Sequence, residues 1–156
     1  GPLVFVPMAI ASVSLPILAQ AWEQGDHAAF RQLFMRIMAF GTLVALLPAL
    51  VVVALSPQIM RAYGEGFASG GAVLILLALA APLHVASKIS VAAIQGMNKA
   101  WYLPALRTFW GIILVGFALI SIGNLGAEGL ALAFLSSFLA LAVLHVLFVW
   151  RLSAAK

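Results

Sequence analysis

Long apolar stretches separated by short polar segments run along the whole chain and set the expected architecture. Each stretch holds about 20 residues or more, without the strict alternation of a half-buried strand. At about 1.5 Å per residue, a helix of that length crosses a hydrocarbon core of about 30 Å. The pattern predicts five membrane-spanning helices, at about residues 2–22, 37–60, 72–96, 101–122 and 127–150.

The same pattern decides the fold class. Strands of an outer-membrane barrel would alternate lipid-facing and lumen-facing residues, and these stretches do not. A helix is then the remaining way for backbone polar groups to find partners inside lipid. The composition agrees, since 65% of the residues are hydrophobic and 8% are charged, against roughly a quarter charged in soluble domains. We expect an all-α polytopic membrane bundle, with residues 1–156 forming a single transmembrane unit.

The polar segment between the first two spans has a helical pattern of its own. In EQGDHAAFRQLFMR, residues 23–36, apolar side chains recur every three or four positions. This spacing predicts a short amphipathic helix lying on the membrane surface. Asp26 is the expected N-cap, because its carboxylate can accept from the first backbone N–H groups.

The positive charges predict an orientation. Cytoplasmic loops carry an excess of Lys and Arg. Only Arg61 follows an even-numbered span, whereas six cations follow odd-numbered spans, namely Arg31, Arg36, Lys99, Arg107, Arg151 and Lys156. We therefore expect a multi-pass protein of the cytoplasmic (inner) membrane with its C-terminus in the cytoplasm.

Lys88 lies inside the central stretch, 72–96, around which the rest of the chain is expected to be organised. A lysine at mid-bilayer costs about 2.5 to 3.5 kcal/mol, so it usually faces a partner, a water-filled cavity or the nearby surface. His84 and Gln95 share its helix face. Two interpretations of Lys88 stay open: it lines a substrate pathway, or its long stem carries the ammonium to the surface or a structural partner. The same choice applies to Arg107, and His84 could equally be a core histidine bonded to a neighbouring helix.

The sequence lacks the residue patterns expected for metal binding, nucleic-acid binding or catalysis. The chain has no cysteine and three scattered histidines, so neither disulfides nor a metal site is expected. Its few cations form no basic cluster, which argues against a nucleic-acid partner. The spans hold no paired acids and no serine beside a base, so we expect neither an enzyme nor a cofactor.

The order of motifs PILAQAWEQGDHAAFRQLFMR, YGEGF, IQGMNKAW and GAEGLALA resembles the C-terminal half of polysaccharide and O-antigen flippases of the multidrug/oligosaccharidyl-lipid/polysaccharide exporter superfamily. The resemblance implies two six-helix lobes around a central cavity, with transport by alternating access. The five spans would match the last five of the second lobe, and the N-terminal lobe would be missing. The chain begins at Gly1 within apolar sequence, so a fragment is expected.

The resemblance also implies a substrate and the residues that meet it. The substrate would be a lipid-linked oligosaccharide or polysaccharide precursor. It would enter a cationic cavity from the surrounding membrane lipid. Lys88 would be the matching cation here, with Arg107 a weaker candidate.

Two other functions remain as alternatives. Multidrug or cation antiporters of the same superfamily commonly use intramembrane carboxylates, whereas the acids here fall in loops or at span ends, at Glu23, Asp26, Glu65 and Glu128. A non-transporting structural membrane subunit fits the composition as well. It predicts that Lys88 and His84 contact the helices of a partner and not a cavity.

Overall fold

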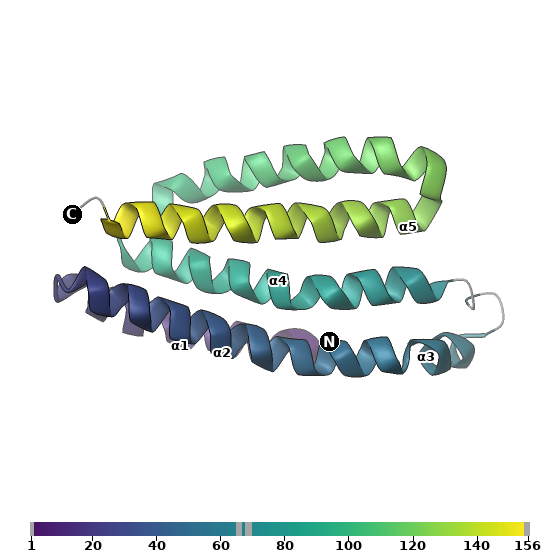
Figure 1. Cartoon of the computed structure of the whole chain (residues 1–156), viewed down its shortest axis with the longest axis horizontal. Coiled ribbons are helices and arrows are strands. Elements are labelled where there is room, and N and C mark those ends of the chain that lie inside the picture. The colour runs from purple at the N-terminus through teal and green to yellow at the C-terminus, as the bar shows by residue number, and fades with distance from the viewer. Residues whose placement is uncertain (1, 65–66, 68–69, 155–156) are drawn as a thin grey trace.

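The computed structural model describes residues 2–64, 67 and 70–154, and these are almost entirely helical, with no strand among them. Long rods lie side by side (Figure 1). In chain order the elements are α1 (Pro2–Glu23), α2 (His27–Ala54), α3 (Ser56–Ala62), α4 (Gly71–Gly96), the short 3-10 turn η2 (Ala100–Tyr102) and α5 (Leu103–Ala154).

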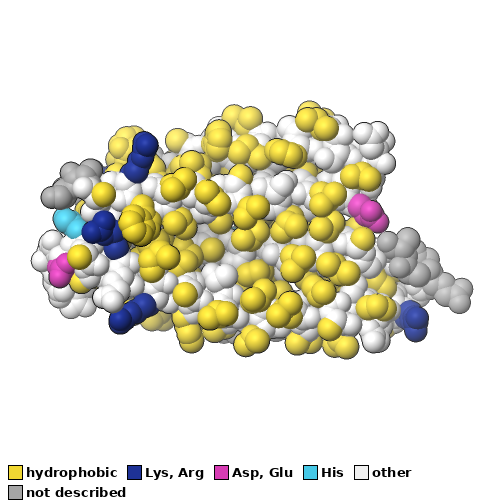
Figure 2. All heavy atoms as spheres, viewed as in Figure 1, with side chains coloured by type: hydrophobic (Ala, Val, Ile, Leu, Met, Phe, Trp, Pro, Cys, Tyr) yellow, Lys and Arg dark blue, Asp and Glu magenta, His cyan; other side chains and the backbone are white. Residues whose placement is uncertain are grey.

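The expected all-α class is confirmed, and the described residues include three helices long and apolar enough to cross a membrane. These are His27–Ala54, Gly71–Gly96 and Ala100–Ala154. Figure 2 shows hydrophobic side chains along the length of one face, with Lys and Arg mostly toward the end where the C-terminus lies. An apolar exterior of this extent is typical of a membrane-embedded protein.

The last helix reverses on itself. α5 has 52 residues, which would extend about 78 Å as a straight rod. At Gly126 the backbone leaves the helical region, with φ 54 and ψ −127, and the chain turns back so that two arms lie side by side (Figure 1). The left-handed φ favours glycine there. The arms, residues 103–125 and 127–154, occupy the positions of the predicted spans 101–122 and 127–150.

The predicted surface helix at residues 23–36 is wrong. α2 is one continuous helix from His27, and Phe30 and Phe34 on its first turns are fully buried in the core of the bundle. The apolar face therefore meets other helices and not the lipid surface. Asp26 does cap this helix as expected, because its carboxylate accepts from the backbone N–H groups two and three residues later, at 3.1 and 2.9 Å.

The second predicted span, 37–60, is interrupted near its end. α2 stops at Ala54, and Pro57 lies in the first turn of α3, where its missing N–H costs no helical hydrogen bond. Ser56 Oγ donates to the Gly71 carbonyl at 3.2 Å and thereby ties α3 to the start of α4. Glu65, in the loop between them, lies outside the described residues.

α4 is the central helix, as expected from its sequence, because it packs against α1, α2, α3 and α5. Small residues allow two of these close approaches. A side chain at Gly96 would meet the backbone N of Ala19 on α1 at 3.0 Å, and one at Gly41 on α2 would meet Ile89 at 2.6 Å.

One side of α4 is only partly covered by the other helices, and we call it the open stripe. Most other positions in the second half of the helix are buried, whereas residues at the spacing of one helix face are exposed or half-buried. The open stripe consists of Leu77, Ala81, His84, Lys88, Val91 and Gln95.

Candidate functional site

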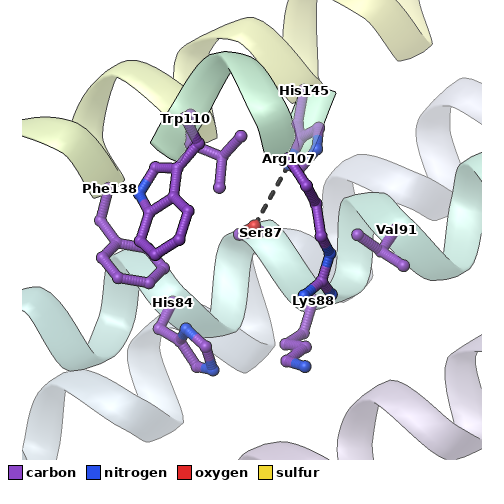
Figure 3. Close-up of a pocket in the computed structure, with 9 residues that line it drawn as sticks. His84, Ser87, Lys88, Val91, Arg107, Trp110, Phe138 and His145 are labelled. Atoms are coloured by element: carbon purple, nitrogen blue, oxygen red, sulfur yellow. Dashed lines mark hydrogen bonds between the residues drawn. The ribbon is translucent and has the colours of Figure 1, made fainter. Parts of the chain in front are cut away.

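A cavity of about 110 Å³ lies where α4 meets the two arms of α5 (Figure 3). A buried cavity needs only about 10 to 15 Å³ to hold a water molecule, so this one has room for several. Cationic, imidazole, hydroxyl and aromatic side chains share its wall. The lining residues are His84, Ser87, Lys88, Val91, Arg107, Trp110, Phe138, Leu141 and His145.

Two cations converge on this pocket from different helices. Lys88 belongs to α4, and Arg107 extends from the first arm of α5 toward it (Figure 3). None of the nine lining residues carries a carboxylate. Lys88 is half-buried and Arg107 is exposed; inside a membrane, cations without a counter-ion attract an anion more strongly than they would in water. The pocket therefore favours a negatively charged ligand.

A buried histidine joins α4 to the second arm of α5. A hydrogen bond of 3.2 Å connects Ser87 Oγ with His145 Nδ1, and His145 is only 1% exposed. Its other ring nitrogen, Nε2, is buried with no hydrogen-bond partner among the described residues. When Ser87 donates its hydroxyl proton to Nδ1, the ring proton lies on Nε2, which is then a buried donor without a partner among the described residues.

Trp110 supplies a second buried nitrogen of the same kind. Its Nε1, which can only donate, has no partner in the described part of the chain. The indole is held in place by Phe138, whose ring centre lies 5.2 Å away, and Phe138 also packs edge-on against His84 at 5.0 Å. Both nitrogens are fully buried, so neither faces the open space of the cavity.

The structure brings three of the four predicted site residues together. His84, Lys88 and Arg107 all line the pocket. Gln95 lies on the same face of α4 but outside the pocket, exposed near the end of the open stripe, about 10 Å along the helix from Lys88. His84 contacts the neighbouring helix through its ring against Phe138.

Sequence reasoning missed four lining residues that give the pocket its polar and aromatic character. Ser87, Trp110, Phe138 and His145 were not among the predicted site residues. The spacing of residues around Gly126 could have predicted that His145 lies near Arg107. Arg107 and His145 are equally far from Gly126, since 126 − 107 and 145 − 126 are both 19, and arms that fold back at that glycine bring such residues to the same level.

The described residues contain no group of three or more His, Cys, Asp or Glu side chains placed to hold a metal ion. Comparisons with known proteins found no family model that matches the chain, no similar curated protein and no similar solved structure.

Proposed function

We propose that the chain is part of a membrane transporter that moves a lipid-linked oligosaccharide or polysaccharide precursor across the cytoplasmic membrane by alternating access. The observation that carries the proposal is the pocket itself. Two cations line it, beside imidazole, hydroxyl and aromatic side chains, and no carboxylate does. Such a wall suits the phosphate groups that join a glycan to its lipid carrier.

The size of the pocket limits what enters it. About 110 Å³ accommodates a phosphate-sized group and excludes an oligosaccharide. In the proposed mechanism Lys88 and Arg107 hold the phosphate by charge. The glycan lies outside, along the open stripe toward Gln95, and the lipid tail stays in the bilayer. An N-terminal lobe of the kind found in the flippases that the chain resembles would close the other side of this path.

The proposed placement has five crossings, by α1, α2, α4 and the two arms of α5. The C-terminus lies in the cytoplasm, because most Lys and Arg residues belong to that end. In this orientation the pocket is open to the cytoplasmic half of the membrane, from which a lipid-linked precursor enters.

A multidrug or cation antiporter is the second candidate, and the positions of the acids argue against it. Glu23 ends α1, Asp26 caps α2, and Glu128 follows directly after the reversal of α5. Glu65 lies outside the described residues. A structural subunit is the third candidate, and it requires a partner helix on the open stripe in place of a path.

The test compares Lys88→Ala and Arg107→Ala with Lys99→Ala in the protein that contains this chain. Lys99→Ala removes the same charge as Lys88→Ala but lies outside the pocket. One charge-assisted hydrogen bond is worth about 1.5 to 3 kcal/mol, so each pocket variant should lower delivery of lipid-linked glycan by about 10-fold or more at equal protein level. Lys88→Arg should keep part of the activity. Unchanged delivery in both pocket variants would remove these residues from the pathway.

A further inference from the structure

A second cavity, of about 490 Å³, lies between α1 and α2, and we call it the α1–α2 groove. It follows α1 from Ala9 to Ile17, a length of about 12 Å. The groove is open to the outside of the bundle, since Val13 and Phe40 on its walls are 59% and 64% exposed. A leaflet of the hydrocarbon core is about 15 Å deep, so the groove matches most of one leaflet.

The groove wall is apolar apart from two side chains, Ser14 and Arg36. Ser14 already has its partner, because its hydroxyl donates to the Ile10 carbonyl at 2.6 Å. Arg36 is exposed and pairs with no carboxylate among the described residues. The guanidinium is thus the polar group that an occupant of the groove would meet.

The depth of Arg36 indicates which occupant this is. Arg31, one and a half turns earlier, lies over the ring of Trp150 at 5.6 Å, and tryptophan favours the level of the lipid head groups. Arg36 is five residues farther along α2, about 7 Å deeper. A long side chain at that depth extends toward the head groups, where lipid phosphates are its natural partners.

We propose that the α1–α2 groove binds an anionic phospholipid, with one acyl chain along α1 and the phosphate on Arg36. Shape and charge act together here, because the apolar wall takes the chain and the guanidinium selects the negative head group. A helix in the same place would bury Arg36 against apolar side chains unless that helix carried an acid. This site is separate from the pocket at Lys88, and it stands whether or not the chain transports a glycan.

The chain has no cysteine, so a single fluorophore can be placed in the groove. Val13→Cys is labelled with bimane, and the protein is reconstituted into phosphatidylcholine vesicles. These contain either doxyl-labelled phosphatidylglycerol or doxyl-labelled phosphatidylcholine at the same mole fraction. We expect the anionic lipid to quench the label at least 2-fold more strongly than the neutral one. A label at Val143, exposed on α5 away from the groove, should show no preference.

Charge variants separate the site from general attraction to a basic surface. Arg36→Gln should abolish the preference at Val13, Arg36→Lys should keep part of it, and Arg151→Gln should leave it intact. Arg151 is an exposed cation near the C-terminal end of α5, outside the groove. Equal quenching by the two lipids overturns the proposal, as does equal loss in Arg36→Gln and Arg151→Gln. Weak quenching by both lipids also overturns it, because it means that a protein segment fills the groove.

Discussion

The reversal of α5 depends on a contact that only glycine permits. A Cβ atom at Gly129 would lie 2.6 Å from the carbonyl carbon of Ser121, closer still to its oxygen, and 3.1 Å from the nitrogen of Ile122. These are backbone atoms of the opposite arm, so no side-chain rotation relieves the overlap. We predict that Gly129→Ala forces the two arms apart at their tip.

The size of the effect follows from two opposing contributions. Overpacking costs about 1 to 3 kcal/mol, and a rigid backbone contact belongs at the upper end of that range. Alanine in place of glycine in a helix regains about 0.5 to 1 kcal/mol. The net loss for Gly129→Ala is then about 2 kcal/mol, a shift of roughly 30-fold in the unfolding equilibrium. Gly123→Ala is the matched control, because nothing lies within 4 Å of a Cβ there, and it should be neutral or slightly stabilising.

Both variants can be unfolded by sodium dodecyl sulfate from a mild detergent and followed by circular dichroism. In a background that keeps Trp110 as its single tryptophan, fluorescence gives a second readout, since the indole packs against Phe138 of the other arm at 5.2 Å and its emission should change when the arms separate. Equal stability of Gly129→Ala and Gly123→Ala would refute the tight turn. It would also remove the basis for placing Arg107 beside His145.

Three further predictions concern other parts of the fold. Asp26→Ala should lower the free energy of unfolding by about 1 kcal/mol through loss of the N-cap, and Asp26→Asn should restore most of it in the same detergent titration. A double-mutant cycle of Ser87→Ala and His145→Ala should give a coupling of about 0.6 kcal/mol, typical of an interhelical hydrogen bond in a membrane protein; zero coupling would mean the bond does not form. Cysteines at Tyr63 and Lys99 should react with an impermeant maleimide from opposite sides of the membrane, and labelling from one side would contradict the proposed topology.

Apolar run length was enough to place several helices to within a residue or two. The predicted span 72–96 corresponds to the helix Gly71–Gly96, and the predicted span 2–22 corresponds to the helix Pro2–Glu23. The length of a run is a property of the chain alone. The prediction of a surface helix at residues 23–36 was wrong because a helix on a lipid surface and a helix packed among other helices have the same spacing of apolar positions. Phe30 is buried by helices that its own periodicity does not reveal.

The site was predictable only in part, for a related reason. Lys88 attracts attention by itself, because a charge inside a long apolar run needs a partner. His145 and Ser87 are ordinary residues until the fold places them 3.2 Å apart. The two side chains come together because the chain turns before η2 and again at Gly126. The positions of these turns determine which residues of α4 and α5 lie side by side.

The fold of α5 also bears on how the chain enters its membrane during synthesis. Between Arg107 and Arg151 the only charged residue is Glu128, two positions after the bend. A helical hairpin of this kind can partition into lipid as one unit. Carrying its single acid across costs about 2.5 to 3.5 kcal/mol, and each Leu, Ile, Phe or Val at the centre of a helix contributes about 0.3 to 0.6 kcal/mol in favour of insertion. In the proposed placement, Arg151 at its C-terminal base stays in the aqueous phase and keeps the hairpin from sliding through.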